Sequence, residues 1–167
     1  MKSAHWWPAY IGIGSNLESP AEQVRRAIAA LRNMPHCILV HESGLYRSAP
    51  MGPQDQPDFI NAVVSLLTQL DAAKLLRALQ AIEEKHGRER NEEQWGPRIL
   101  DLDLLAYGNQ EFDREELTLP HPGIAGRNFV LLPWSEITPH FRVPGLASVA
   151  DLAATVSGNE PRIERLD

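Results

Sequence analysis

The chain has 167 residues, of which 43% are hydrophobic and 23% charged, and a net charge of −6 at pH 7. This length suits a single domain with its own core, which we expect to span residues 1–167. The negative charge argues against a nucleic-acid partner, and no apolar run approaches the ~20 residues that span a membrane. The lone Cys37 excludes an internal disulfide and a cysteine-based zinc cluster. Because residues 1–10 also lack the apolar core of a signal peptide, we expect a cytoplasmic protein.

The first half of the chain alternates strand and helix patterns. A short strand at 10–13 leads through Gly14-Ser15-Asn16, which reads as a tight turn, into a helix ending at 33–35. Ser19, Pro20 and Glu22 predict a capping box at the start of that helix. A second strand is predicted at 38–40, with a continuation toward Tyr46.

An irregular loop then separates the second strand from the third. Residues 48–59 read SAPMGPQDQPDF, and their prolines and glycine exclude regular structure. Loops of this length inside a compact domain are usually functional or disordered. A third strand is predicted at 60–67, and Asp71 is expected to cap a second helix that ends at His86-Gly87. A second polar loop, 88–97, follows it.

The fourth strand, predicted at 99–106, carries two carboxylates within an apolar run. Side chains alternate along a strand, so Asp101 and Asp103 point the same way, roughly 6.5–7 Å apart, and Leu100, Leu102 and Leu104 point the other way, into a core. Such a pair repels itself unless a cation lies between its members, and magnesium prefers oxygen ligands supplied by carboxylates and substrate phosphates. Arg88, Arg90 and Arg98 precede the pair, as phosphoryl transfer would require. The alternative is a solvated pair, or one matched by arginines.

Beyond this strand, the sequence predicts a short apolar segment at 130–137 and an amphipathic helix at 148–156 capped by Ser148. The last ten residues carry no readable function. The element order predicts an α+β fold, a ferredoxin-like βαββαβ sandwich with a C-terminal helical extension. We expect two helices on one face of a four-stranded antiparallel sheet. We also expect a monomer, because no long coiled-coil pattern occurs.

Four stretches, read together, resemble the 6-hydroxymethyl-7,8-dihydropterin pyrophosphokinase family of folate biosynthesis. They are YIGIGSNLESP, LYRSAPMGPQDQPDFINAVV, RNEEQWGPRILDLDLLAYGN and LTLPHPGIAGRNFVLLPWSEI, which run in the order of the family and span most of residues 10–137. GPQDQPDFIN and WGPRILDLDLL are the most specific of these motifs. The resemblance implies a ferredoxin-like fold, in agreement with the element order.

The resemblance also implies the reaction and its cofactors. ATP would transfer its β,γ-pyrophosphoryl group to the hydroxymethyl oxygen of the pterin, and AMP would leave. Asp101 and Asp103 match the residues that hold two magnesium ions, while Arg88 and Arg98 match arginines that bind the phosphates. Further matches on the ATP side are Gln80, Glu83, Arg90, Trp95, Leu104, His121 and Arg127.

The pterin pocket is implied in the same way. A flat ring rich in donors and acceptors needs aromatic stacking and amide hydrogen bonds. Phe59 and Phe129 match two rings that enclose the pterin, and Asn61 matches the residue that reads its edge. Ser48 and Met51 match loop positions that line the pocket.

Three other interpretations are weighed against this one. A metal-dependent nucleotidyl- or glycosyltransferase would use the same pair of aspartates but does not explain GPQDQPDFIN. A non-enzymatic ferredoxin-like binding module would expose its acids as a solvated surface. A catalytically inactive relative is the most serious rival, and the retained carboxylates and arginines argue against it.

Overall fold

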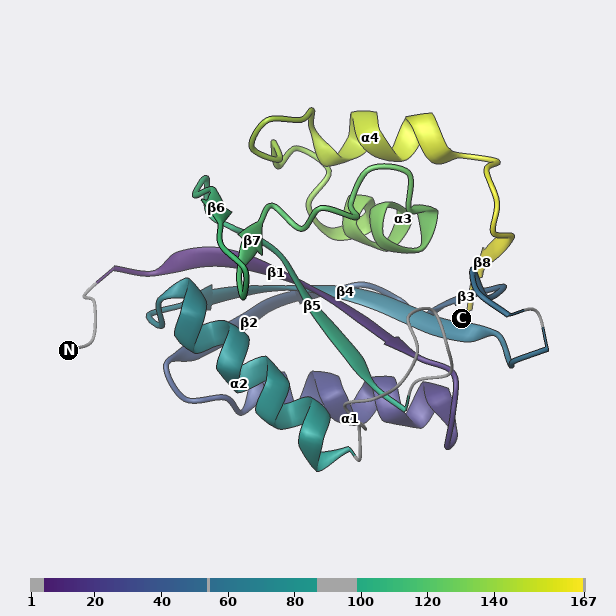
Figure 1. The fold of residues 1–167 in the computed structure, drawn as a ribbon, viewed down its shortest axis with the longest axis horizontal. Coiled ribbons are helices and arrows are strands. Elements are labelled where there is room, and N and C mark those ends of the chain that lie inside the picture. Colours follow the sequence, from purple (N-terminus) through teal and green to yellow (C-terminus); the bar gives the residue numbers. More distant parts are fainter. Residues whose placement is uncertain (1–4, 54, 87–98, 167) are drawn as a thin grey trace.

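The computed structural model describes residues 5–53, 55–86 and 99–166 (Figure 1). The helices are α1 (Pro20–Arg32), α2 (Ala72–Lys85), α3 (Asn128–Ile137) and α4 (Val149–Val156). The strands are β1 (Trp7–Ser15), β2 (Cys37–Glu42), β3 (Tyr46–Ser48), β4 (Phe59–Thr68), β5 (Asp101–Tyr107), β6 (Phe112–Asp113), β7 (Thr118–Leu119) and β8 (Ile163–Arg165).

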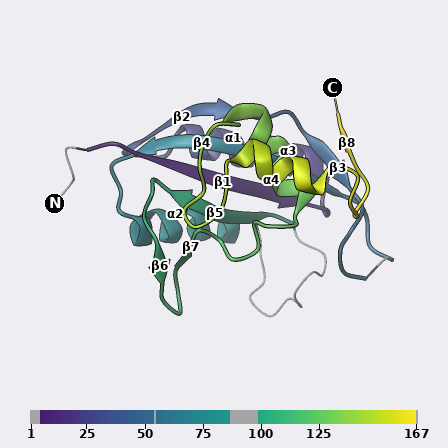
Figure 2. The same ribbon diagram turned by 90° about the horizontal axis from the view of Figure 1, so that it is seen from above.

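An antiparallel sheet forms the centre of the molecule, with the strand order β5-β1-β4-β3-β8 and β2 paired to the other half of β4. The described sheet is therefore six-stranded, and our expectation of four strands was wrong. The predicted second strand is divided because the chain leaves the ladder at 43–45. The Ser43 hydroxyl accepts the Val63 N–H at 2.9 Å, so the segment between β2 and β3 remains attached to β4. β8, seen beside β3 in Figure 2, was not predicted.

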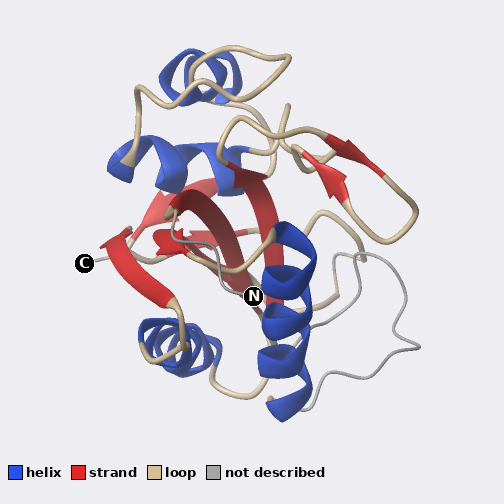
Figure 3. Ribbon diagram, turned by 90° about the vertical axis from the view of Figure 1, so that its left-hand side faces the viewer, coloured by secondary structure: helices blue, strands red, loops and turns tan. Residues whose placement is uncertain are grey.

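Helices cover both faces of the sheet (Figure 3). We call the side under α1 and α2 the first face and the side under α3 and α4 the second face. Alternate residues of β1, such as Ile11 and Ile13, pack on the first face with Leu31 and Leu75. On the second face, Tyr10, Leu105, Trp134 and other residues form a separate buried cluster. α1 and α2 do share one face as expected, but α3 was read only as an apolar segment.

Two of the three predicted helix caps are confirmed. The Asp71 carboxylate accepts the Lys74 N–H at 2.8 Å, and the Ser148 hydroxyl accepts the Asp151 N–H at 3.1 Å. The capping box at Ser19 was wrong: its backbone is left-handed (φ 62°) and its side chain makes no cap hydrogen bond. A capping side chain needs extended backbone at that position to reach the first turn. No helix in the described ranges has the length and apolar character needed to cross a bilayer.

Candidate active site

The two aspartates lie on the same face of β5, as predicted. Asp101 and Asp103 are half-buried on the second face, whereas Leu102 and Leu104 are buried in the core of the first face. β5 is an edge strand of the sheet, and β1 is its neighbour.

Glycines lie directly beside the aspartates on β1. Gly14 is the cross-strand partner of Asp101 and Gly12 that of Asp103, and Gly14 is also the partner of Asn61 on β4. Since strands lie roughly 4.8 Å apart, Asp101 and Asn61 are separated by about 10 Å of sheet. A glycine contributes no side chain there, so the surface between them is backbone. We call Gly12 and Gly14 the glycine floor.

Our sequence interpretation had assigned Gly14 to a tight turn and had missed this floor. A methyl group on Gly14 would lie 3.4 Å from the Asn61 Oδ1 and would press on that amide. The available signal was the spacing of the two glycines: two residues apart in a strand, they share a face, and glycine in a strand often marks a close approach by a ligand.

Asn61 is held in a fixed orientation on β4. It is buried, and its Nδ2 donates to the Ser48 hydroxyl at 2.8 Å and to the Tyr46 carbonyl at 3.5 Å. With its Nδ2 directed toward β3, its Oδ1 points toward the glycine floor. Ser48 thus contributes by orienting Asn61 from β3, whose register with β4 places Tyr46 opposite Asn61.

Phe59 begins β4, two residues before Asn61, and shares the same face of the strand. The preceding loop is attached to the turn after β1, because the buried Asn16 donates through Nδ2 to the Gln56 side chain and to the Pro57 carbonyl, both at 2.9 Å. Met51 in this loop is 48% exposed. The sequence had not indicated a role for Asn16.

His121 approaches the aspartates from the loop before α3. Its backbone N–H donates to the Leu105 carbonyl of β5 at 2.9 Å, and its Nδ1 accepts the Gly123 N–H at 3.0 Å. The proton of the neutral ring is therefore on Nε2, which lies 3.9 Å from the Asp103 Oδ1. Burial lowers the pKa of His121, Arg127 lowers it further, and Asp101 opposes both. These groups favour a neutral imidazole that donates from Nε2.

Arg127 and Phe129 flank the start of α3. The Arg127 guanidinium lies 6.0 Å from the centroid of the Phe129 ring and fills the space above Gly123, where any side chain would overlap it. Arg127 is the N-cap residue of α3 and Phe129 its second residue, so a cation and a ring project from one end of this helix. Their roles on the ATP side and the pterin side remain predictions.

Glu83 has a role that the sequence did not reveal. It is 4% exposed, and its Oε2 accepts the N–H of Leu102, between the two aspartates, at 2.7 Å. This carboxylate therefore joins α2 to the outer edge of β5. Gln80, one turn earlier, is exposed. Because the Leu104 side chain lies in the core of the first face, any nucleotide contact there falls to its backbone.

The remaining predicted residues, Arg88, Arg90, Trp95 and Arg98, lie outside the described part of the chain. Within it, no group of three or more His, Cys, Asp or Glu side chains forms a metal cage. Two carboxylates with oxygen ligands only are a donor set that suits magnesium, which commonly uses one or two carboxylates and completes its shell with phosphate and water. The residues present thus fit that ion better than zinc or copper.

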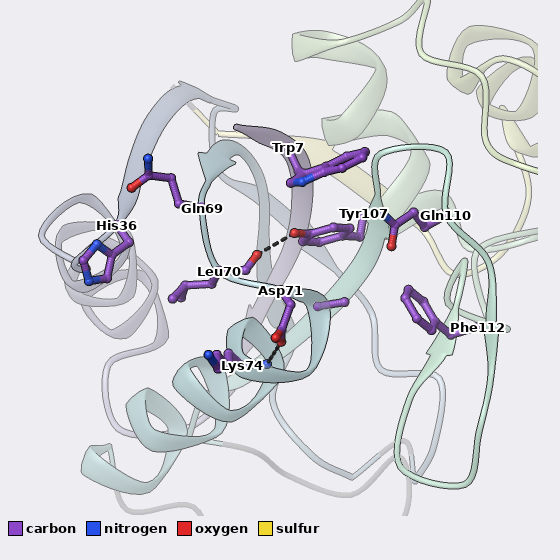
Figure 4. Close-up of a pocket in the computed structure, with 10 residues that line it drawn as sticks. Trp7, His36, Gln69, Leu70, Asp71, Lys74, Tyr107, Gln110 and Phe112 are labelled. Atoms are coloured by element: carbon purple, nitrogen blue, oxygen red, sulfur yellow. Dashed lines mark hydrogen bonds between the residues drawn. The ribbon is translucent and has the colours of Figure 1, made fainter. Parts of the chain in front are cut away.

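A separate hollow of about 410 Å³ lies at the other end of β5 (Figure 4). Trp7 and Tyr107 stack in its wall with ring centroids 6.0 Å apart, and the Tyr107 hydroxyl donates to the Leu70 carbonyl. The Asp71 carboxylate in its rim is already engaged as the cap of α2. None of the predicted site residues lines this hollow.

Comparison with known proteins agrees with the motifs and the geometry. A protein called 2-amino-4-hydroxy-6-hydroxymethyldihydropteridine pyrophosphokinase from Haemophilus influenzae is 44% identical over 144 residues, which cover 86% of this chain and 89% of that protein. The protein of the same name from Pseudomonas aeruginosa is 45% identical over 145 residues, covering 87% and 89%.

A solved structure shares the fold. The crystal structure of Plasmodium falciparum HPPK-DHPS wild type with pterin and p-hydroxybenzoate matches with a TM-score of 0.72 at 14% identity, over 98% of this chain and 46% of that one. The present chain thus spans less than half of that protein. The sequence model of the 7,8-dihydro-6-hydroxymethylpterin-pyrophosphokinase family matches residues 10–139. The chain therefore belongs to the 7,8-dihydro-6-hydroxymethylpterin-pyrophosphokinase family.

Proposed function

We propose that the glycine floor, with Asp101 and Asp103 on one side and Asn61 on the other, is the active site of this pyrophosphokinase. The family reaction transfers the β,γ-pyrophosphoryl group of ATP to the hydroxymethyl oxygen of 6-hydroxymethyl-7,8-dihydropterin and releases AMP, in folate biosynthesis, and membership assigns it to this chain. The main support for this proposal is the strand register, in which Gly14 of β1 lies between Asp101 of β5 and Asn61 of β4.

On the ATP side, we assign the carboxylates to metal binding and the cationic and N–H groups to phosphate binding. Asp101 and Asp103 would hold two Mg²⁺ ions, which supply charge neutralisation of the triphosphate and Lewis-acid activation of the attacking oxygen. The His121 Nε2–H, 3.9 Å from Asp103, is placed to donate to a phosphate oxygen beside the carboxylates. Arg88 and Arg98 would add forked contacts to the phosphates, and Arg127 a further cation. Arg90, Trp95, Gln80, Glu83 and Leu104 complete the proposed ATP side.

On the pterin side, Asn61 would recognise the polar edge of the ring by hydrogen bonding. With its Nδ2 engaged by Ser48 and Tyr46, its Oδ1 is directed at the floor, where it would accept from a ring donor. Phe59 and Phe129 would enclose the ring, and Met51 would line the loop side. The floor of backbone admits a flat ligand between the amide and the carboxylates, which brings the hydroxymethyl oxygen toward the metal-binding pair.

We further propose a ferredoxin-like assignment for residues 7–107, followed by a C-terminal helical extension, within one domain of residues 1–167. The strand order β5-β1-β4 with β2 and β3 on the far side of β4, and α1 and α2 on one face, supports it. We propose a cytoplasmic monomer. Sedimentation of the purified protein and imaging of the tagged chain would test these last two points.

The test of the function is AMP formation from ATP, with and without magnesium and with and without 6-hydroxymethyl-7,8-dihydropterin. AMP release that requires both confirms the reaction and the substrate together. ADP and inorganic phosphate as products would point to another kinase chemistry. Magnesium-dependent ATP binding without AMP release would mean that the pterin is the wrong acceptor or that the chain is inactive.

A further inference from the structure

The C-terminal segment 159–166, which we call the strap, lies beyond the part of the chain that the family model matches, residues 10–139. It leaves α4 and returns to the sheet, where β8 lies next to β3 in both Figures 1 and 2. The strap touches two structures that carry predicted pterin contacts. One is β3, which orients Asn61, and the other is the start of α3, which carries Phe129.

The contact with β3 is a complete short ladder. Tyr46 pairs with Arg165 and Ser48 pairs with Ile163. The ladder continues past both ends of β3, since the Ala49 N–H donates to the Arg162 carbonyl at 3.0 Å and the Leu166 N–H donates to the Leu45 carbonyl at 2.7 Å. β3 is therefore held between β8 on one side and the pocket-bearing end of β4 on the other.

The contact with α3 is made by one buried amide. Asn128, 1% exposed, donates through its Nδ2 to the Asn159 carbonyl at 3.0 Å and to the Pro161 carbonyl at 2.7 Å. Asn128 lies between Arg127 and Phe129 in the chain. Its amide thus fixes the beginning of α3 to the beginning of the strap.

A carboxylate on α3 also contacts both β3 and the strap. Glu136 accepts from the Tyr46 hydroxyl at 2.7 Å, from the Gly44 N–H at 3.0 Å and from the Arg165 Nε at 3.1 Å. The Arg165 guanidinium occupies the space that a side chain at Gly44 would fill. The carboxylate therefore joins α3, β3 and the strap at one point, and its partner Tyr46 is also the residue whose carbonyl accepts from Asn61.

We propose that the strap is a positioning element of the pterin pocket, which sets the separation of its two walls, Ser48–Asn61 on the sheet and Phe129 on α3. This proposal rests on the proposed function. The Asn128 end of the strap adjoins Arg127 of the proposed ATP side, whereas the Arg165 end contacts Glu136 and β3. Loosening the Arg165 end should therefore weaken pterin binding selectively and leave ATP binding and the chemical step largely intact. Arg165 is the residue to change, because its side chain is 51% exposed and its loss leaves no cavity.

The experiment compares steady-state kinetics of Arg165→Ala, Arg165→Lys and Glu164→Ala with wild type. Glu164 is the matched control: it lies in the same strand, and its ion pair with Arg47 at 3.2 Å is exposed and away from Glu136. We expect Arg165→Ala to raise the pterin KM about five- to tenfold, because it removes both half-exposed hydrogen bonds from the guanidinium to Glu136, with ATP KM and kcat within twofold. Arg165→Lys, which keeps one cationic donor, should recover part of the loss.

Hydrogen exchange of the ligand-free protein provides a readout that needs no turnover. Arg165→Ala should speed amide exchange at Ala49 and Leu166, whose N–H groups donate across the β3–β8 ladder, and leave β1 protected. The strap is refuted as a positioning element if Arg165→Ala behaves as Glu164→Ala does, or if the KM values for pterin and ATP rise together. A wild-type protein that forms no AMP would overturn the proposed function and the strap with it, whereas an active wild type with a silent Arg165→Ala overturns the strap alone.

Discussion

Replacing Glu83 by alanine would test how α2 holds the strand that carries the aspartates. Its Oε2 accepts the Leu102 N–H at 2.7 Å from within the protein, at a side chain that is only 4% exposed. β5 lies at the edge of the sheet, and this N–H has Glu83 as its acceptor. The substitution removes the acceptor and leaves the donor buried.

The expected loss of stability follows from two contributions. A buried N–H without a partner costs about 1–3 kcal/mol, and the removed methylene adds about 0.8 kcal/mol. The sum, roughly 2–4 kcal/mol, corresponds to a fall in Tm of about 4–16 °C for a chain of this size. Glu83→Gln keeps an acceptor oxygen in place, so it should lose only the difference between a charged and a neutral hydrogen bond, about 1 kcal/mol.

The assay is thermal unfolding followed by circular dichroism, paired with a magnesium titration of AMP formation. Glu84→Ala is the matched control, because Glu84 is exposed on the same helix and should change stability by less than about 0.5 kcal/mol. If β5 also loses its alignment, Glu83→Ala will need more magnesium for half-maximal activity than Glu83→Gln. A Glu83→Ala protein that unfolds within about 0.5 kcal/mol of wild type would refute the reasoning.

Three further predictions follow from the site and the strap. Asp103→Ala should fold normally yet lose at least about 10³-fold in turnover, the loss of several kcal/mol of charge stabilisation; near-normal activity with magnesium would exclude the metal role. Gly14→Ala, whose methyl group meets the Asn61 Oδ1 at 3.4 Å, should raise the pterin KM more than Gly12→Ala, which contacts only Leu105; equal values would argue against the glycine floor. Burial raises the pKa of Glu136, but hydrogen bonds from Arg165, Tyr46 and Gly44 outweigh it and leave that pKa below its ordinary 4.5. The stability that Glu136 adds is therefore present above pH 4.5 and lost as pH falls through the lowered pKa, so denaturation of wild type and Glu136→Gln should converge only in acid.

The elements that the sequence predicted are those whose periodicity matches their burial. α1, α2 and α4 each bury one apolar stripe, and β4 and β5 are apolar runs bounded by turn residues. α3 was missed as a helix because it is apolar on most sides and contains Pro133, so no stripe marks its period. β8 has three residues, Ile163–Arg165, and pairs with a strand more than a hundred positions earlier, which local pattern cannot reveal.

The same distinction applies to the site. Asp101 and Asp103 were predictable because alternation along one strand is enough to place them on one face. The buried contact from Glu83 to Leu102 and the placement of Gly14 between Asp101 and Asn61 depend on how α2 and β4 are positioned against β5 and β1. These relations between distant segments arise from strand register and helix docking, and the sequence alone did not specify either.

We propose that Gly14 in the glycine floor serves a ligand and not the stability of the fold. Glycine within a strand is less stable than alanine by about 0.5–1 kcal/mol, so Gly12 and Gly14 together weaken β1 by about 1–2 kcal/mol. Neither position needs glycine for its backbone, since neither has a positive φ. A methyl group on Gly12 would make ordinary contact with Leu105 at 3.5 Å, and one on Gly14 would meet the Asn61 amide. Gly12 is buried beneath the Leu105 side chain, whereas Gly14 is only partly buried, so Gly14 is the position that leaves backbone accessible between Asp101 and Asn61, where we propose that a flat substrate lies.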